Sequence, residues 1–225
     1  MEETLGFWAF SHTIVIPRLM EGIWITLKLA ILSGVIGFIL GMIIALMRLS
    51  RFKMMNWLAL GYVTLFRGTP LLLQILFIYF ALPTLINVNL DSFPAGILAL
   101  SLNCAAYLAE IFRAGILSIP KGQTEAAKAL GLSHNQTMFK IIIPQTYRRI
   151  IPPVVNEFSA LTKETSLVSV ISLGELLYVT QRIGAKYLRP WEVYFWSGLG
   201  YLMIVLLLSY VASRLERNLL LKGGV

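Results

Sequence analysis

Charged and amide side chains recur at regular spacing inside stretches of the chain that are otherwise apolar. Asn103, Tyr107 and Glu110 stand at i, i+4 and i+7, so a helix places them on one face. Glu157 and Glu164 share a second helical face. A charge at the centre of a membrane helix costs about 2.5–3.5 kcal/mol, so such groups face protein, a cavity or an opposite charge. The chemistry that these residue types support is binding of a polar solute inside a membrane.

A third set, Arg67, Leu71 and Gln74, shares a face in the preceding apolar stretch, and we expect the three faces to converge. Two interpretations stay open: a path for substrate, or ion pairs between helices, such as Arg67 with Glu110 or Glu164. Charges near predicted helix ends favour the ion pairs, because paired or snorkelling charges are common there. These charges are Arg67, Glu110, Arg113, Lys163 and Glu164.

The composition indicates the environment that must hold these residues. Of the 225 residues, 57% are hydrophobic and 13% are charged, whereas soluble domains carry about 25% charged residues. This excludes a soluble protein with a large core as the preferred class. The net charge of +8 comes from basic residues between apolar segments, where they set topology, so no nucleic-acid partner is expected.

Five stretches are long enough to cross a bilayer, which takes about 20 apolar residues. The predicted fold is therefore an all-α integral membrane protein with five transmembrane helices in one domain, residues 1–225. The cations gather at 48–53, at 113–149 and after 213, so the N-terminus is expected outside and the C-terminus in the cytoplasm. The predicted spans are Gly22–Met47, Trp57–Leu82, Phe93–Leu117, Ile150–Leu173 and Trp191–Ala212.

The segment 118–149, expected on the cytoplasmic side, is polar and helix-forming. Thr124 is suited to cap a helix of strong helix formers that ends before Gly131. Ser133 is suited to cap a second short helix, which Pro144 stops or bends. Helix chemistry alone leaves two interpretations open: a docking element for a partner, or an ordinary interfacial helix-turn-helix.

The spacing in this segment is more specific than its helix chemistry. It reads EAA-x3-G-x9-I-x-I-P from Glu125 to Pro144. The chain resembles permease subunits of ATP-binding-cassette importers of the polar amino acid uptake family, over nearly its whole length. Ile143 and Cys104 depart slightly from the family pattern. The resemblance also rests on the motifs Phe66–Gln74, Asn103–Ile116 and Asn156–Leu167.

The resemblance implies a type I ABC importer permease in the bacterial inner membrane. It implies three kinds of partner: two cytoplasmic ATPases, a second permease copy (identical or a close paralogue), and an external amino acid binding protein. ATP and Mg would be bound by the ATPases, and this chain would hold no cofactor. The residues implied to couple to the ATPases are Glu125, Ala126, Ala127, Gly131 and His134.

Within this resemblance, Glu157 is the strongest candidate for substrate contact. It lies well inside its predicted span, with no cation of that segment within one turn. A carboxylate in that position suits the side-chain cation of Arg, Lys or His, although import of Gln or Glu remains an alternative. Asn103 is suited to bind the backbone of the amino acid. The candidate substrate-binding residues are Glu157, Asn103, Tyr107 and Gln74.

Other functions lack support in the sequence. A G-x4-G-K-[ST] motif is absent, so this chain is not expected to bind ATP through a P-loop, and it carries no catalytic constellation that would make it an enzyme. Two distant histidines, His12 and His134, and one cysteine make a metal site unexpected. A secondary transporter is the main rival, but it would be longer, show inverted repeats and need no ATPase-docking loop.

Three smaller features make structural predictions. Gly37 and Gly41 form a G-x3-G pattern, which favours packing within the subunit over a dimer seam. Pro70 is expected to kink the second span. Pro152 and Pro153 are expected at the start of the fourth span, where they restrict its entry angle.

Overall fold

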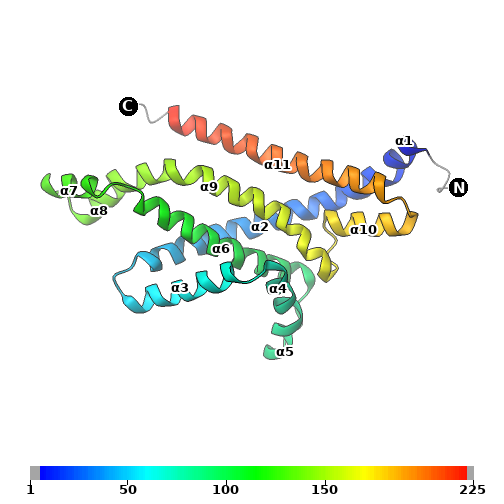
Figure 1. Ribbon diagram of the computed structural model, residues 1–225, viewed down its shortest axis with the longest axis horizontal. Helices are drawn as coiled ribbons and strands as arrows, with labels where there is room; N and C mark the ends of the chain where they lie inside the picture. Colours follow the sequence, from blue (N-terminus) through cyan, green and yellow to red (C-terminus); the bar gives the residue numbers. More distant parts are fainter. Residues whose placement is uncertain (1–5, 222–225) are drawn as a thin grey trace.

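The computed structural model of the chain describes residues 6–221, with side chains described to residue 211 and at 214. All regular structure in these residues is helical (Figure 1). In chain order the helices are α1 (Phe7–Phe10), the π-turn η2 (Ser11–Val15), α2 (Ile16–Leu49), α3 (Lys53–Gly68), α4 (Leu71–Leu76), the π-turn η3 (Phe77–Ala81), α5 (Leu82–Ile86), α6 (Ser92–Leu117), α7 (Lys121–Ala129), α8 (His134–Thr137), the π-turn η4 (Met138–Ile142), α9 (Ile143–Glu164), the 3-10 helix η5 (Thr165–Ile171), α10 (Leu176–Tyr187) and α11 (Pro190–Leu221).

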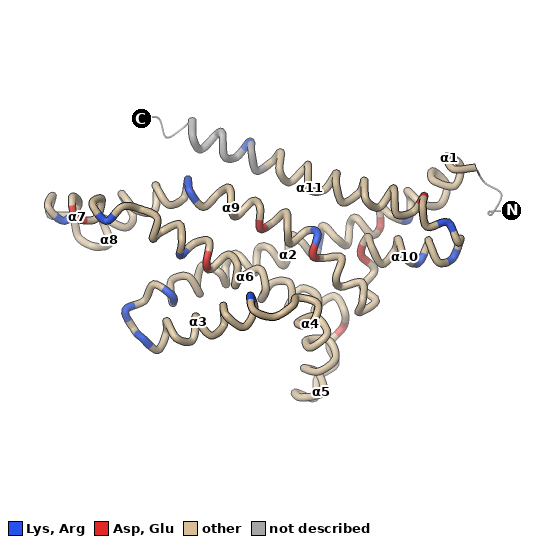
Figure 2. The backbone as a smooth tube through the Cα atoms, viewed as in Figure 1, with Lys and Arg blue, Asp and Glu red and all other residues tan. Residues whose placement is uncertain are grey.

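The long helices α2, α6, α9 and α11 run along the length of the molecule (Figure 1). One end holds α7, α8, the α2–α3 turn and the end of α11, and the other holds α1 and α10. The segments expected in the cytoplasm therefore lie at one end, whereas α5 projects from the side of the molecule, apart from α1 and α10 (Figure 1). Basic residues mark the α2–α3 turn and α10 (Figure 2). The side chain of Arg217 and all of Lys222, both counted among the tail cations, lie outside the described residues.

Within the described residues, three helical segments are long and apolar enough to cross a membrane: Phe7–Leu49, Ser92–Leu117 and Pro190–Val211. A fourth arises if the bent pair of Lys53–Gly68 and Leu71–Ile86 counts as one span. The second predicted span, Trp57–Leu82, is thus not one straight helix. Its two parts meet at 105°, because Thr69 and Pro70 adopt extended backbone angles between α3 and α4.

The fourth predicted span also differs from expectation. The helix begins at Ile143 instead of Ile150, so Pro152 and Pro153 lie inside α9 and not at its start. Beyond Glu164 it tightens into the 3-10 turns of η5. This helix is too polar to rank among the apolar spans. It packs against α6, α11 and α2, with Thr146, Leu161 and Thr162 buried.

The two short helices of the 118–149 segment are present, with altered starts. The first begins after Pro120, so Thr124 lies inside α7 and does not cap it. Ser133 caps α8 as predicted, in a capping box with Gln136. Gly131 takes a left-handed φ of 76° after α7, as its predicted position requires. Pro144 does not stop the second helix, because it lies in the first turn of α9 after the π-turn η4.

The closest helix packing lies between α2 and α6. Gly37 faces the Cβ and Sγ atoms of Cys104, and Gly41 faces Ala105 and Leu108. The glycine pattern therefore packs within the subunit, as predicted, and Cys104 is a buried packing residue. Small residues on both helices let the two backbones approach closely, the arrangement that membrane helices favour.

Replacing Gly41 with alanine is expected to destabilise the fold. The added Cβ would lie 2.9 Å from Leu108 Cβ and 3.0 Å from the carbonyl oxygen of Ala105, so the helices must separate. Overpacking of this kind costs about 1–3 kcal/mol. The control is Gly61→Ala on α3, where an added Cβ meets nothing within 4 Å and alanine gains roughly 0.5–1 kcal/mol in a helix. Thermal unfolding in detergent should separate the two variants; equal midpoints would contradict the close α2–α6 packing.

Candidate functional site

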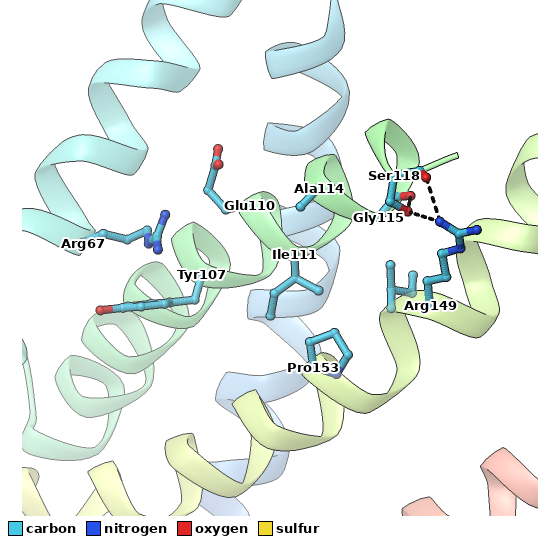
Figure 3. Close-up of a pocket in the computed structure, with 10 residues that line it drawn as sticks. Arg67, Tyr107, Glu110, Ile111, Ala114, Gly115, Ser118, Arg149 and Pro153 are labelled. Atoms are coloured by element: carbon cyan, nitrogen blue, oxygen red, sulfur yellow. Dashed lines mark hydrogen bonds between the residues drawn. The ribbon is translucent and has the colours of Figure 1, made fainter. Parts of the chain in front are cut away.

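An open cleft of about 570 Å³ lies between α3, α6 and α9. Figure 3 shows Arg67 reaching in from α3, Tyr107 and Glu110 from α6, and Pro153 from α9. Two of the three polar faces predicted to converge therefore meet at this cleft. The lining residues are Arg67, Tyr107, Glu110, Ile111, Ala114, Gly115, Ser118, Arg149, Ile150 and Pro153.

Arg67 stacks on an aromatic ring at the deep side of the cleft. Its guanidinium carbon lies 5.0 Å from the centroid of the Tyr107 ring, and the arginine side chain is exposed to the cleft. Glu110 is paired with Arg48 and Arg113 instead of Arg67, and the pairing of Arg67 with Glu164 stays a prediction. The helix spacing alone did not show which arginine would pair with the Glu110 carboxylate.

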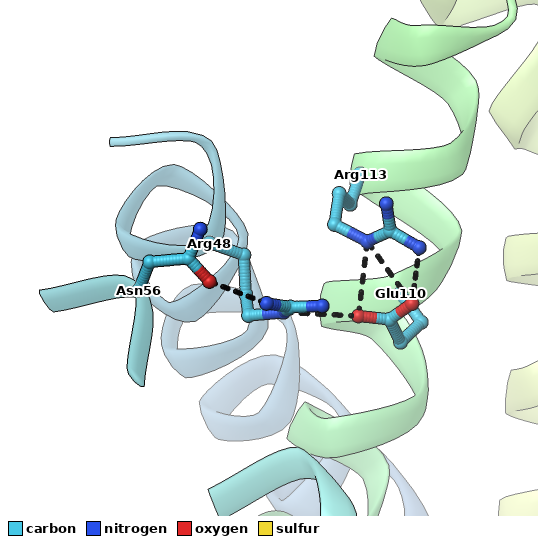
Figure 4. Close-up of polar contacts among 4 residues, drawn as sticks. All are labelled: Arg48, Asn56, Glu110 and Arg113. Carbon is cyan, nitrogen blue, oxygen red and sulfur yellow. Dashed lines mark hydrogen bonds and ion pairs between the residues drawn. The ribbon is translucent and has the colours of Figure 1, made fainter. Parts of the chain in front are cut away.

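Glu110 is shared by two arginines at the wall of the cleft (Figure 4). Arg113 Nη2 donates to Glu110 Oε2 at 2.7 Å, and Arg113 Nε lies within 3.1 Å of both carboxylate oxygens. Arg48 Nε donates to Glu110 Oε1 at 3.4 Å, and Arg48 Nη1 donates to Asn56 Oδ1. The cluster ties the end of α2 to α3 and α6. Glu110 thus belongs to an ion pair, as expected, but with partners that were not named.

Gln74 and Asn103, both predicted to bind substrate, contact each other. Asn103 Nδ2 donates to Gln74 Oε1 at 3.0 Å, and both side chains are buried. Gln74 Nε2 donates to the carbonyl oxygens of Phe66 at 2.8 Å and Thr69 at 3.1 Å. A helix end leaves carbonyls without helical partners, and these amides satisfy two of them at the bend before Pro70. In the structure, Gln74 and Asn103 therefore stabilise the bend between α3 and α4.

Glu157 lies on α9, one turn beyond the cleft residue Pro153. Its side chain is half-buried, while its neighbour Asn156 is exposed. The charges of Glu164 and Arg67 both act on Glu157. The third polar face, that of α9, therefore lies within electrostatic reach of Arg67.

The predicted coupling residues lie at one end of the molecule. Glu125, Ala126, Gly131 and His134 are exposed, and Ala127 is buried against the rest of the segment. Backbone hydrogen bonds close the turn: the amide of Gly131 donates to Lys128 and that of Leu132 to Ala127.

Two large apolar side chains in the same segment escaped the sequence analysis. Leu130 is 81% exposed and Phe139 is 71% exposed. They stand beside the exposed face of α7 and α8, where apolar surface suits contact with another protein. The signal was available in the sequence, since both are apolar residues within a polar segment.

Glu175 is a second residue that the sequence analysis missed. It is fully buried, and its carboxylate accepts hydrogen bonds from the amides of Leu177 and Tyr178 at the start of α10. Tyr201 on α11 donates to the same carboxylate at 2.6 Å, and the amide of Leu176 donates to Thr26 Oγ1 on α2. Glu175 therefore joins α10 to α11, and the neighbouring Leu176 amide joins α10 to α2. In the described part of the chain, no group of three His, Cys, Asp or Glu side chains could hold a metal ion.

Comparison with known proteins identifies the family. Residues 37–220 match the family described as "Binding-protein-dependent transport system inner membrane component". The chain belongs to this family of inner membrane transport components. Its relatives there are permease subunits of amino acid ABC transporters, and this chain is accordingly an amino acid ABC transport permease with membrane-spanning helices.

Three similar proteins illustrate the relationship. The arginine transport system permease protein ArtQ of Bacillus subtilis (strain 168) is 44% identical, over 93% of this chain and 96% of its own. The glutamine transport system permease protein GlnP of Escherichia coli (strain K12) is 39% identical, over 91% and 94%. The crystal structure titled as an amino acid ABC transporter with histidines matches with a TM-score of 0.88 at 38% identity, over 96% of this chain and 99% of that chain. The fold is thus that of ABC importer permeases.

Gln74→Leu is expected to lower stability without changing which amino acid is preferred. The substitution removes the Gln74 donor from the Phe66 and Thr69 carbonyls and the acceptor from Asn103, which keeps its bond to the Phe66 carbonyl at 3.3 Å; an unsatisfied buried group costs about 1–3 kcal/mol. Thermal unfolding should show the loss, while Gln181→Leu on the exposed face of α10 should be nearly neutral. A selective change in the apparent affinity for one amino acid, with unchanged stability, would instead return Gln74 to a direct substrate role.

Proposed function

We propose that this chain is the membrane-spanning subunit of an ATP-driven amino acid importer in a bacterial inner membrane. Two permease subunits, identical or closely related, form the translocation path. Two ATPase subunits, which bind ATP and Mg, dock on the cytoplasmic segment, and an external binding protein delivers the amino acid. The observation that carries this proposal is the exposed helix-turn-helix of α7 and α8, with its EAA-x3-G spacing and exposed Leu130 and Phe139.

The proposed topology has five spans. The bent α3–α4 pair serves as the second, and α9 as the fourth. A helix as polar as α9 is tolerated at membrane depth because its charged residues face neighbouring helices and a cavity, not lipid. This topology places α7 and α8 in the cytoplasm with the C-terminus, and the N-terminus outside, in agreement with the distribution of basic residues.

The proposed substrates are the cationic amino acids Arg, Lys and His. Glu157 supplies the negative charge for the side chain, and a second acid, Glu164, lies close enough to act on it. The named arginine permease among the relatives supports this choice, and the named glutamine permease supports the alternative, a Gln or Glu importer. An ATP-independent transporter is the remaining alternative, which the docking segment argues against.

The overall test is uptake by a reconstituted complex. The chain would be co-expressed with its neighbouring ATPase, placed in proteoliposomes and supplied with each of the twenty amino acids, with and without ATP. ATP-dependent accumulation of Arg, Lys or His is expected. Accumulation of Gln or Glu would keep the importer and reject the cationic preference. Uptake that ignores ATP would overturn the importer itself.

Glu157→Gln is expected to reduce uptake of cationic amino acids. A hydrogen bond to a charged group contributes about 1.5–3 kcal/mol, and each 1.4 kcal/mol is a factor of ten, so apparent affinity should fall roughly 10- to 100-fold. The matched control is Glu21→Gln, the same change at an exposed position of α2. Assembly with the ATPase should persist in both variants. Unchanged uptake by the Glu157 variant would show that Glu157 is not a substrate contact.

Gly131→Arg and Glu125→Lys are each expected to abolish stimulated ATPase activity and uptake. Arginine at position 131 must adopt a φ of 76°, which costs about 1–3 kcal/mol, and it also obstructs the docking face. The control is Gly122→Arg in the first turn of α7, which has open space and ordinary backbone angles. Co-purification with the ATPase is the measurement. Normal association and uptake in either variant would reject the docking assignment.

A further inference from the structure

Arg67 is a charged residue in the last turn of α3, and helix packing does not account for its presence there. It stands 14 residues into α3, so at 1.5 Å per residue it lies about 21 Å along the helix. An arginine at membrane depth costs about 2.5–3.5 kcal/mol unless it serves a cavity or a partner. Its side chain is exposed to the cleft and makes a cation–π contact with the ring of Tyr107. An intramembrane charge in a cavity is a candidate ligand contact.

The contact with Tyr107 leaves guanidinium donors of Arg67 accessible. The guanidinium carbon lies over the Tyr107 ring, 5.0 Å from its centroid, and the arginine side chain is exposed. The N–H donors lie in the plane of the guanidinium and point outward from its edge. Two parallel donors on that edge match the two oxygens of a carboxylate. The aromatic ring therefore orients Arg67 while its edge stays available to an anion.

The acidic residue that lines the cleft is already paired and is not available to Arg67. Glu110, the acidic residue that lines it, already accepts hydrogen bonds from Arg113 and Arg48. The other lining cation, Arg149, donates to the carbonyl oxygen of Ser118 at 2.7 Å and to its hydroxyl at 3.1 Å. The balance of charge around the cleft is positive, so the cleft favours an anionic group.

An acid stands one helical turn from the same cleft. Pro153 lines it, and Glu157 follows at i+4, on the same face of α9. Arg67 lines the same cleft as Pro153, and its charge is opposite to that of Glu157 and acts on it. A molecule with a carboxylate at one end and a cationic group at the other has the complementary pair of charges.

We propose that Arg67, held against Tyr107, binds the α-carboxylate of the transported amino acid in this cleft, on the side of the ligand opposite to Glu157. The inference rests on the proposed function, and it adds a requirement that is independent of the side chain. Any α-amino acid that enters the cleft presents the same carboxylate to Arg67. Amines and α-amides of the same size lack that negative charge and bind poorly.

The test is direct binding to the assembled permease–ATPase complex in lipid nanodiscs, without the binding protein, because that protein has its own selectivity. The probes are L-arginine and L-glutamine, each compared with its α-amide, argininamide and glutaminamide. The unmutated complex is expected to favour the acid of at least one pair by about tenfold or more. Arg67→Gln should remove that preference by weakening the acid and leaving the amide unchanged.

Two further variants make the result specific. Lys53→Gln removes one positive charge from the exposed start of the same helix, outside the cleft, and should keep the full preference. Arg67→Lys keeps the charge but loses the two-donor edge, so the preference should fall severalfold. It also serves as the informative variant if Arg67→Gln fails to assemble, which size-exclusion chromatography would reveal.

The outcomes separate this inference from the proposed function. If the unmutated complex accumulates amino acids with ATP but binds acid and amide equally, the carboxylate contact is rejected and the importer stands. The contact is also rejected if the Arg67 variants keep the full preference. If the complex neither binds nor accumulates any amino acid at millimolar concentration, both proposals fall.

Discussion

The close contact between α2 and α6 is the constraint on which the rest of the structure depends. Gly37 and Gly41 bring the α2 backbone against Cys104, Ala105 and Leu108. That contact fixes the rotation of α6 about its own axis. The other faces of α6 then present Asn103 to the α3–α4 bend, Tyr107 to Arg67, and Glu110 to the arginines at the helix end. A bulkier α2 would displace every one of these polar contacts at once.

The polar groups around α6 solve one physical problem in different ways. An unsatisfied polar group in a low-dielectric interior is costly. At the α3–α4 bend, Gln74 and Asn103 supply the donors that the interrupted helix lacks. At the helix end, Glu110 is neutralised by two arginines. At the start of α10, Glu175 accepts three donors from α10 and α11.

Arg67 and Glu157 stand apart from these closed arrangements. Each is partly accessible, and each interacts with its neighbours through charge or stacking instead of a complete set of hydrogen bonds. Groups that are fully bonded hold a structure in place, whereas groups with unused donors and acceptors are available to a ligand. This difference separates residues with a closed set of contacts from residues with open contacts, although the sequence places both kinds on the same helical faces.

Local features of the sequence predicted local features of the fold. Ser133 and Gly131 occupy the expected cap and turn positions, because cap preferences depend on the few residues around them. The glycines of α2 predicted packing within the subunit because they leave room for a second backbone, and in the structure they pack against α6. The helical class followed from composition, because a membrane leaves few alternatives to helices.

Features that depend on distant contacts were not predictable in the same way. A hydropathy window averages over direction, so it joined α3 and α4 into one span although the chain turns by 105° at Pro70. Helix periodicity put Arg67 and Glu110 on converging faces, but the choice of Arg48 and Arg113 as partners depends on where α2 ends. The roles of Gln74 and Asn103 followed from the bend and could not be separated from ligand binding without it.

The polarity of α9 bears on how the exposed segment of α7 and α8 is joined to the cleft. An apolar span would sit equally well in lipid at many rotations, whereas a helix that carries Glu157 must keep that face towards α6 and the cleft. The same helix continues without a break from α8 through η4 into α9, so Ser133 at the surface and Glu157 at the cleft belong to one helical path. A displacement of α8 therefore acts on the continuous helix that carries Glu157. The π-turn η4 is the point on that path where helical hydrogen bonding changes. The cost of orienting a polar helix thus ties the orientation of α9 at the cleft to the exposed α8 segment.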